Sequence, residues 1–372
     1  MRAAAIFGLG TSPADLKPFQ GSSPTEWLQG LPTSSSDADA ILIFGGDGTI
    51  HRHLPALVRL QLPVLIVPAG SGNDFARALN LRSMRDSLRV WRDFESGKIQ
   101  AQAIDLGVIV SSAAPERTHY FCCVAGCGLD SAVTRSANQM PRWLRGHGGY
   151  ALALLPMLLK FPAFSLRLTG VNGKDHTEAE KLTLLAAFAN TQFYGDGMRI
   201  APEADLADGK LDICRISTVN PFKLFCLFPT VYLGRHLLLP EVEYSRAERV
   251  HVHSETPLEI YADGEFVCET PAEISVAPGA LRVIHSPRQS AEGGGTGVSP
   301  VQQGGDARFS SSERARTAHR GRCSVRARER GVRPGIPIAG SQSSQRRGAR
   351  LQLPESCVPP PRAESGIPLP RA

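Results

Sequence analysis

The stretch ILIFGGDGTIHRHLPALVRLQLPVLIVPAGSGNDFARAL, residues 41–79, places two glycine-rich segments directly after two short apolar segments. The apolar segments, Ile41–Phe44 and Val64–Val67, are typical of buried parallel strands. Glycines after such strands permit tight turns of positive φ, whose N–H groups can face a phosphate. Asp47 lies among the first glycines, where a carboxylate repels a nucleotide unless a divalent cation lies between them. The sequence therefore predicts a site for a metal–nucleotide complex.

A simpler interpretation is that each segment is an ordinary turn, because one glycine-rich loop is a weak signal. Neither loop has the G-x-G-x-x-G spacing of dehydrogenases, and no Lys follows the glycines as in a Walker A loop. Residues 73–94 are predicted to form one helix, capped by Asn73 or Asp74, whose N-terminus can receive an anion. Asp47 is expected to be an exposed turn residue whose replacement by Ala leaves the fold intact.

Charge is distributed unevenly along the 372 residues, of which 42% are hydrophobic, enough for two domains. From Pro287 onward there are 15 Arg, no Lys and 6 acidic residues, a net charge of +9. Residues 1–286 hold 26 basic and 29 acidic side chains, a net charge of −3. Residues 287–372 are rich in Arg, Gly, Pro and Ser and are predicted to be a disordered tail. No functional residue is assigned to this tail, and no nucleic-acid partner is expected.

Cysteine and histidine patterns do not predict a metal site. The eight cysteines lack C-x-x-C spacing and are predicted to be reduced, mostly as small residues of the core. The pairs His51/His53 and His251/His253 are interpreted as solvated positions, because no third ligand lies near them in the sequence. The chain begins with a candidate strand rather than a secretory signal, and its longest apolar run, residues 150–159, is half the length of a membrane span. We expect a cytoplasmic protein that associates with membranes only peripherally.

The arrangement of apolar segments predicts an α/β domain followed by a mainly antiparallel β domain. Strands are expected at residues 3–7, 41–44 and 64–67 in the first part and at 120–125, 165–169, 181–189, 211–216, 249–253, 258–261, 272–276 and 281–285 in the second. Helical segments are expected near 132–161 and 221–239. A nucleotide bound by the first domain would face the cleft between the two.

Six motifs together resemble the soluble bacterial diacylglycerol kinase-like lipid kinases, which are related to sphingosine and ceramide kinases and more distantly to NAD kinases. The resemblance covers about residues 38–286. The motifs are GGDGTI (45–50), PAGSGNDFARAL (68–79), IDLG (104–107), CVAGCGLDS (123–131), FANTQFYGDGMRIAPEADLADGKLDI (188–213) and YADGEF (261–266).

The resemblance implies a Rossmann-like α/β nucleotide-binding domain over residues 1–107, closed by a return segment near 270–286. It implies a β-sandwich domain for the lipid substrate over residues 108–270, with the catalytic cleft between the two. The implied activity is transfer of the γ-phosphoryl group of ATP to a hydroxyl of diacylglycerol or a related lipid, with Mg²⁺.

The resemblance also assigns roles to individual residues. The residues implied to bind the nucleotide are Gly45, Gly46, Asp47, Gly48, Thr49, Gly70, Ser71, Gly72 and Asn73, with Gly8 and Gly10 as further candidates. The residues implied to hold the catalytic Mg²⁺ are Asp47, Asp74 and Asp105. Asp263 is implied to be the general base, with Glu265 beside it. A second, structural Mg²⁺ is implied at the side chain of Asp208 with the backbone carbonyls of Asp205 and Lys210.

Asp208-Gly209 and Asp263-Gly264 are, from the residues alone, ordinary Asp-Gly hairpin turns, so that only the resemblance gives them a chemical role. The chain departs from the family at residues 7–13, FGLGTSP, where an N-P-x-x-G loop is usual. The short segment before GGDGT indicates that one helix or strand is missing, and adenine contacts are therefore not assigned.

Two other functions remain open at the level of sequence. NAD kinase shares the GGDGT turn, although GSGNDFAR is the lipid-kinase form of the second loop. A nucleotide-binding regulator without catalysis is the third possibility. The acceptor lipid is not specified by the chain. Candidate acceptor-lining segments are residues 150–159 and 224–239, whose apolar residues fit a plain core equally well, and Arg142–Arg145 are candidates for a membrane-facing patch.

Overall fold

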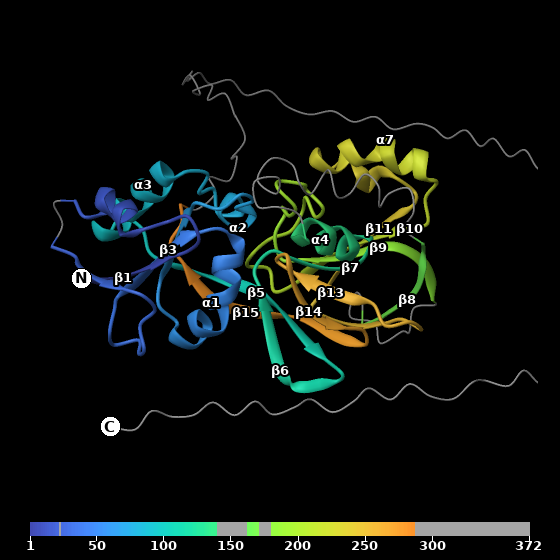
Figure 1. Cartoon of the computed structure of the whole chain (residues 1–372), viewed down its shortest axis with the longest axis horizontal. Helices are drawn as coiled ribbons and strands as arrows, with labels where there is room; N and C mark the ends of the chain where they lie inside the picture. Colours follow the sequence, from blue (N-terminus) through green and yellow to red (C-terminus); the bar gives the residue numbers. More distant parts are fainter. Residues whose placement is uncertain (22–23, 140–161, 171–179, 287–372) are drawn as a thin grey trace, which may run out of the picture. The chain divides into compact units, whose positions relative to one another are not determined.

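The computed structural model describes residues 1–21, 24–139, 162–170 and 180–286, which belong to a single compact unit (Figure 1). Three predicted features lie outside the described residues: the tail at 287–372, the patch at 142–145 and the apolar segment at 150–159. None of the helices in the described ranges is long and apolar enough to cross a membrane.

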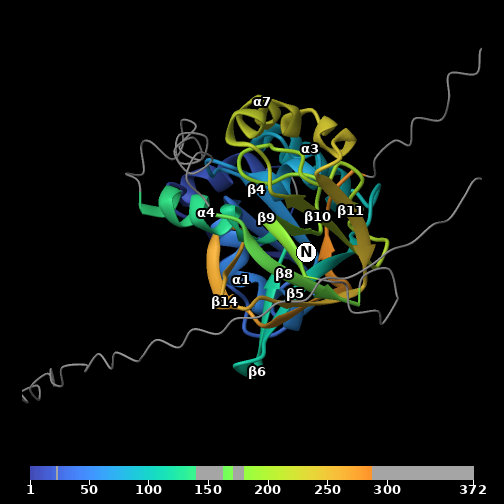
Figure 2. The ribbon, with the colours of Figure 1, turned by 90° about the vertical axis from the view of Figure 1, so that its right-hand side faces the viewer.

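The N-terminal half is a parallel sheet covered by helices on both faces. Its strands are ordered β2-β1-β3-β4, with bounds β1 (Arg2–Phe7), β2 (Glu26–Gln29), β3 (Ala40–Gly45) and β4 (Val64–Pro68). Every residue of β3 is buried, which explains its continuous apolar sequence. The helices α1 (Asp47–Leu60) and α3 (Met84–Glu95) lie on opposite faces of these strands (Figures 1 and 2). Strand β2, which was not predicted, pairs with β1 at the edge of the sheet.

The helix predicted over residues 73–94 is wrong as a single element. It is divided into α2 (Asp74–Ala78) and α3 (Met84–Glu95). Asn80 adopts a left-handed conformation with φ of 59°, which ends the first helix. Ser83 then caps the second, because its hydroxyl accepts a hydrogen bond from the backbone N–H of Asp86 at 3.3 Å. The apolar residues that predicted one helix belong to both α2 and α3, since each helix buries apolar side chains, and so the break between them left no gap in the pattern.

The C-terminal half is largely antiparallel. Its strands pair in the order β14-β13-β7-β9, with β9 also bonded to β8 and β10, and β10 to β11. Their bounds are β7 (Val124–Gly128), β8 (Phe164–Thr169), β9 (Lys181–Ala189), β10 (Leu211–Ser217), β11 (Val242–Ala247), β13 (Glu259–Ala262) and β14 (Glu265–Glu269).

Two helical segments accompany this half. The helix α4 (Leu129–Gln139) is the described part of the predicted segment 132–161. The segment predicted at 221–239 is α7 (Pro221–Tyr232) followed by a short 3₁₀ helix, Arg235–Leu238, because Gly234 turns the chain with φ of 67°. In Figure 2, α7 lies along one side of the molecule, over β10 and β11.

A long antiparallel pair, β5 (Gln102–Ser111) with β15 (Ala272–Val283), joins the two halves. Strand β15 was predicted as two strands, and its register shifts between Ala277 and Leu281, which explains the gap in the pattern. One end of β15 pairs with β12 (Arg249–His253), and at the other end Val283 pairs with Val64 of β4 in parallel orientation. The hairpin partner of β5, β6 (Ala114–Phe121), projects from the body in Figure 1. The chain therefore returns to the first sheet after completing the second half.

Candidate active site

A cavity of about 840 Å³ lies where loops from the two halves of the structure meet. This volume is within the range of nucleotide and small-ligand sites. The first half contributes the ends of β1, β3 and β4 and the start of α1. The second half contributes the start of α4, the 194–196 loop and the β13–β14 turn. The residues that line the cavity are Phe7, Gly8, Leu9, Gly46, Asp47, Gly48, Thr49, Arg52, His53, Ala69, Gly70, Ser71, Gly72, Asp74, Cys123, Val124, Asp130, Thr134, Tyr194, Gly195, Asp196, Tyr261, Asp263, Gly264 and Glu265.

The two glycine-rich loops touch each other through backbone atoms. A Cβ added to Gly46 would lie 2.8 Å from the Cα of Gly70, and one added to Gly70 would lie 2.5 Å from the Cα of Gly46. Asn73 closes the second loop, since its side chain accepts a hydrogen bond from Gly70 N–H at 2.8 Å and donates one to Gly70 C=O at 2.6 Å. The glycines at these two positions therefore serve close approach of the two loops.

The glycines of the first loop, Gly45, Gly46 and Gly48, do not use the positive φ that glycine permits. Gly46 has φ of −104°, and neither of the other two is in the left-handed region. Gly45 is required by packing instead, because its Cβ would lie 2.7 Å from the hydroxyl of Thr49. Gly8 faces the same hydroxyl, at 2.3 Å from its would-be Cβ. Thr49 is thus held between the ends of β1 and β3.

Asp47 begins α1, and its carboxylate caps the neighbouring helix α2. Its Oδ2 accepts a hydrogen bond from Asp74 N–H at 2.9 Å, and its Oδ1 accepts one from Phe75 N–H at 3.1 Å. Burial raises the pKa of Asp47, and the charge of Asp263 acts in the same direction, against the two amide hydrogen bonds and the charge of Arg77. The expectation of an exposed turn carboxylate is wrong, because this side chain links the two loops.

Asp74 lies beside Asp47 and is 4% exposed. A Cβ at Gly72 would lie 3.3 Å from Asp47 Oδ2 and 3.9 Å from Asp74 Oδ2, so the two carboxylates converge on the same point. Burial and the charge of Asp47 raise the pKa of Asp74 to about 7, although the charge of Arg77 opposes the shift. Arg77 forms an ion pair with Asp74 Oδ1, and Asp196 N–H donates to Asp74 Oδ2 at 3.0 Å.

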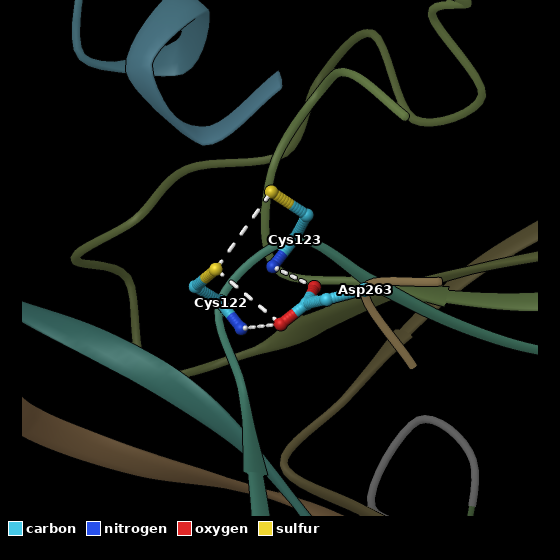
Figure 3. A group of neighbouring side chains, drawn as sticks. All are labelled: Cys122, Cys123 and Asp263. Atoms are coloured by element: carbon cyan, nitrogen blue, oxygen red, sulfur yellow. Dashed lines mark hydrogen bonds between the residues drawn. The ribbon is translucent and has the colours of Figure 1, made fainter. Parts of the chain in front are cut away.

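Asp263 occupies the two-residue turn between β13 and β14, where it and Gly264 have φ of 50° and 89°. These values are those of a hairpin turn that favours Asp-Gly. The turn brings the carboxylate against the chain between β6 and β7: Oδ2 accepts from Cys122 N–H and Oδ1 from Cys123 N–H, each at 2.8 Å (Figure 3). The residue therefore forms the turn and holds its carboxylate rigidly and fully buried next to the cavity.

His51, interpreted from the sequence as a solvated position, lies against Asp263. Its Nδ1 is 3.1 Å from Asp263 Oδ2, and its side chain is 19% exposed. Burial disfavours the charged imidazolium, but the hydrogen bond and charge of Asp263 outweigh it, so the pKa of His51 is raised. The sequence interpretation of His51 is wrong because its partner lies 212 residues further along the chain.

Asp105 is not among the residues that line the cavity. Its Oδ2 accepts a hydrogen bond from Gly209 N–H at 2.7 Å and its Oδ1 accepts one from Gly279 N–H at 2.8 Å. The side chain is buried and joins β5 to the loop after residue 205 and to the irregular part of β15. The structure groups Asp105 with the second predicted cation site rather than with Asp47 and Asp74.

The residues of that second site lie on an exposed loop. Asp208 Oδ1 accepts from Lys210 N–H at 3.0 Å, and Asp205 Oδ1 accepts from Ala207 N–H at 3.0 Å. Gly209, which lies between Asp208 and Lys210, has φ of 71°, a left-handed conformation that glycine adopts without strain. The hairpin turn expected from the residues alone is wrong, because Asp208 is not in the left-handed region and none of the described strands ends directly before it; the chain only bends here ahead of β10.

The cavity brings together most of the residues assigned to nucleotide, metal and catalysis. Those that line it are Gly8, Gly46, Asp47, Gly48, Thr49, Gly70, Ser71, Gly72, Asp74, Asp263 and Glu265. Those that do not line it are Gly10, Gly45, Asn73, Asp105, Asp205, Asp208 and Lys210. Arg52, Tyr194 and Asp196 line it without having been assigned a role. Tyr194 and Asp196 lie within the motif FYGDG, and this motif was the sequence feature that could have identified them as site residues.

The donor set of Asp47 and Asp74 fits a hard divalent cation. Both are carboxylates, whose oxygens are the ligands that Mg²⁺ prefers, and they converge on one edge of the cavity. Burial is the main cause of the raised pKa of both side chains, and the charge of Arg77 opposes it in each case. A cation placed there would favour the ionised form of both side chains.

Two family models match this chain. Residues 23–109 match the diacylglycerol kinase catalytic domain, and residues 123–285 match the YegS C-terminal NAD kinase beta sandwich-like domain.

Curated relatives and solved structures agree with these matches. A diacylglycerol kinase of Mycobacterium tuberculosis is 40% identical over 247 residues, which cover 66% of this chain and 76% of the relative. A diacylglycerol kinase of Bacillus subtilis is 28% identical over 260 residues, covering 68% of this chain and 80% of the relative. The crystal structure of a diacylglycerol kinase from Bacillus anthracis superposes with a TM-score of 0.55 at 19% identity, covering 77% of this chain and 97% of that one, which shows the fold. The predicted fold class, α/β followed by a β-sandwich, is confirmed.

Proposed function

Because the chain belongs to the diacylglycerol kinase family and is an ATP-dependent lipid kinase, we propose that it phosphorylates diacylglycerol at the cavity between its two halves. The observation that carries this proposal is the convergence of Asp47, Asp74 and Asp263 on one cavity beside the N-terminus of α1. Phosphoryl transfer requires positioning, charge neutralisation and an acceptor that can lose a proton. Each requirement has a candidate group among the cavity residues.

The phosphates of ATP are proposed to lie at the N-terminus of α1. This helix has 14 residues, and its N-cap, Gly46, supplies no side-chain hydrogen bond to the first turn. Thr49 N–H is already bonded to Gly46 C=O at 2.9 Å, so the N–H groups of Asp47 and Gly48 are the ones offered to an anion, and the helix dipole favours negative charge. Ser71, exposed on the second loop, and Arg52, on the next turn of α1, line the same cavity and add polar and positive groups.

Asp47 and Asp74 are proposed to hold Mg²⁺, which when bound supplies positive charge to the phosphate oxygens. Asp47 keeps its orientation through the two amide hydrogen bonds from α2. Asp74 is oriented by Arg77 and by the N–H of Asp196. We propose that Asp105 does not contact this Mg²⁺ but supports the site by fixing β5 against the loop that contains Asp208. The second cation is proposed to bind at that loop.

Asp263 is proposed to accept the proton of the acceptor hydroxyl. Its Oδ1 accepts the Cys123 N–H, and a carboxylate oxygen has a second lone pair for another donor. The hydrogen bonds from Cys122 N–H and His51 leave Oδ2 more fully engaged. Glu265 lies two residues further along the turn and lines the cavity, where its charge raises the pKa of His51. The rigid attachment of Asp263 suits a group that must be placed accurately.

The acyl part of the acceptor is proposed to enter an apolar cavity beneath α7. This cavity, of about 60 Å³, shares Asp130 and Tyr194 with the larger one and is lined mainly by aliphatic and aromatic side chains. Leu224, Phe228 and Val231 of α7 form part of its wall. At about 60 Å³ the cavity is far smaller than the roughly 300–1,000 Å³ of small-ligand sites, so an acyl chain enters only if the cavity widens.

A lipid acceptor also implies work at a membrane surface, and peripheral attachment is part of the proposal. We further propose the domain division expected from the sequence, with residues 1–107 and a return segment near 270–286 forming the nucleotide domain and residues 108–270 the acceptor domain. The pairing of Val283 with Val64 supports the return segment.

The test is transfer of labelled γ-phosphate from ATP, with Mg²⁺, into detergent micelles that contain dioleoylglycerol, ceramide or a sphingoid base, and separately into NAD. We expect label in chloroform-soluble phosphatidic acid, lost in Asp263→Asn and retained in Glu116→Gln, whose side chain is exposed on β6. Label in ceramide or the sphingoid base instead would show that this lipid, and not diacylglycerol, is the acceptor. Label only in the NAD reaction would show that the chain is an NAD kinase. ATP binding without any transfer would identify a regulator.

A further inference from the structure

Two thiols and a carboxylate form a compact group at the wall of the cavity. Cys122 Sγ lies 3.3 Å from Asp263 Oδ2 and 4.0 Å from Cys123 Sγ (Figure 3). One ligand atom from each of the three residues lies within 4.8 Å of the other two, and no other such group of three or more His, Cys, Asp or Glu residues occurs in the part of the chain that the structure describes. Cys122 and Cys123 are adjacent residues between β6 and β7, and Asp263 comes from the distant β13–β14 turn.

The spacing of these atoms matches tetrahedral zinc coordination. With Zn–S of about 2.3 Å and Zn–O of about 2.0 Å, tetrahedral angles place two sulfur ligands about 3.8 Å apart and a sulfur and an oxygen about 3.5 Å apart. Two of the three corresponding distances, 4.0 and 3.3 Å, lie within a few tenths of an ångström of these values, and the third, from Cys123 Sγ to the Asp263 carboxylate, is no more than 4.8 Å and has to shorten for an ion to bind. Thiolates are soft ligands that select Zn²⁺ or Cd²⁺ over Mg²⁺, which takes oxygen ligands.

We propose that Cys122, Cys123 and Asp263 form a binding site for one Zn²⁺ ion, separate from the Mg²⁺ site at Asp47 and Asp74. Cys123 and Asp263 are among the residues that line the cavity, although the Asp263 side chain is fully buried and Cys123 is 3% exposed. The fourth coordination position is left to water on the cavity side. His51 keeps its hydrogen bond to Asp263 and orients the ligand carboxylate.

The thiols are neutral before the ion binds. Burial raises the pKa of Cys123 to about 12 and that of Cys122 well above its usual range. Each thiol therefore gives up its proton to solvent as its Zn–S bond forms, so two protons are released for each ion bound. Neutral buried thiols are poor nucleophiles, which argues against a covalent catalytic role for this pair.

Binding at this position would occupy the carboxylate that the proposed function uses as the base. Zn²⁺ is therefore expected to inhibit phosphoryl transfer, and this consequence alone depends on the proposed function. The binding itself does not, and it is tested without ATP or lipid so that failure of one proposal is distinguishable from failure of the other.

The experiment uses the full chain, freed of metal by a chelator and titrated with Co²⁺ as a spectroscopic substitute for Zn²⁺. We expect a thiolate-to-Co²⁺ charge-transfer band in the near ultraviolet that saturates at one Co²⁺ per chain, whatever further Co²⁺ binds at the carboxylates of Asp47 and Asp74, and loss of that band on addition of Zn²⁺. X-ray absorption at the zinc edge is expected to show two sulfur ligands at about 2.3 Å, with oxygen or nitrogen completing the shell.

Matched variants identify which thiols are used. Cys122→Ala/Cys123→Ala is expected to lose the band, whereas Cys214→Ala, a buried cysteine of β10, retains it. Cys323→Ala/Cys357→Ala tests the two cysteines of residues 287–372 and is also expected to retain it. If the double variant at 122 and 123 fails to fold, Cys123→Ala alone is expected to reduce the sulfur count from two to one. A band that survives in the 122/123 variants, or a wild-type chain with no sulfur ligand, would overturn the proposal.

Discussion

The carboxylate of Asp47 accepts a hydrogen bond from the backbone N–H of Asp74 at 2.9 Å, so two acidic residues from successive glycine-rich loops are joined directly. The same carboxylate accepts the N–H of Phe75, which makes it the cap of α2. A residue proposed to hold the cation thus also fixes the geometry of the second loop. Stability and activity are expected to change together when it is replaced.

Replacing Asp47 by Ala is expected to abolish turnover and to lower the free energy of unfolding by about 1–2 kcal/mol, because two helix N–H groups lose their acceptor. Urea denaturation and γ-phosphate transfer check the two effects. Glu116→Gln, an exposed carboxylate of β6, is the control and is expected to stay within about 0.5 kcal/mol of the wild type. Unchanged stability in Asp47→Ala would show that the two hydrogen bonds contribute nothing net.

The pH dependence of stability is expected to report on Asp74. The unfolded chain releases this proton near pH 4, whereas in the folded chain burial and the charge of Asp47 raise the pKa of Asp74 to about 7. Between about pH 4 and pH 7 the folded state therefore holds more protons, so the free energy of unfolding falls as pH rises through this interval. The raised pKa of Asp47 and of His51 acts in the same direction.

The variant Asp74→Asn cannot titrate and is expected to show a flatter profile of unfolding free energy from pH 4 to pH 8. Added Mg²⁺ is expected to raise the melting temperature of the wild type at pH 8, above the raised pKa of Asp74, and to leave that of Asp74→Asn nearly unchanged. If the unfolding free energy of the two proteins changed equally with pH, Asp74 would not be the source of the pH dependence.

The contact between His51 and Asp263 predicts that His51→Ala lowers kcat roughly tenfold, because the proposed base loses a donor that orients it. The KM for ATP is expected to change little, since His51 is not among the residues lining the cavity. His51→Gln retains a hydrogen-bond donor and is expected to recover part of the rate. His251→Ala, an exposed histidine of β12, serves as the control. If His51→Ala and His251→Ala had the same kcat, the contact between His51 and Asp263 would have no role in catalysis.

Close approach of the two loops predicts that Gly70→Ala is damaging. Its Cβ would lie 2.5 Å from the Cα of Gly46, a contact that only movement of one backbone can relieve. We expect a loss of about 1–3 kcal/mol in stability and a rise of roughly tenfold in the KM for ATP, because the phosphate-binding loops are pushed apart. Gly21→Ala, where a Cβ meets nothing within 4 Å, is the matched control. Normal kinetics in Gly70→Ala would separate the loop contact from nucleotide binding.

The Gly-rich loops after β3 and β4, and most of the strands, were predictable because each depends on a local pattern. Buried parallel strands are continuously apolar, and the turn at Asp263-Gly264 requires residues that tolerate positive φ. The break between α2 and α3 was not predictable from periodicity. It depends on Asn80 and Ser83, whose conformations are compatible with a continuous apolar face on both sides.

By itself, the sequence determined most of the strands, the two glycine-rich loops and the acidic residues beside them, because these follow from local propensity, hydrophobic period and turn chemistry. The tertiary structure alone decided which side chains meet. It brought His51 to Asp263 across 212 residues, placed the side chain of Asp105 against the loop that contains Asp208 instead of in the cavity, and set two thiols beside a carboxylate. Such contacts depend on the register and packing of distant strands, and no local pattern in the chain encodes the distance between residues so far apart.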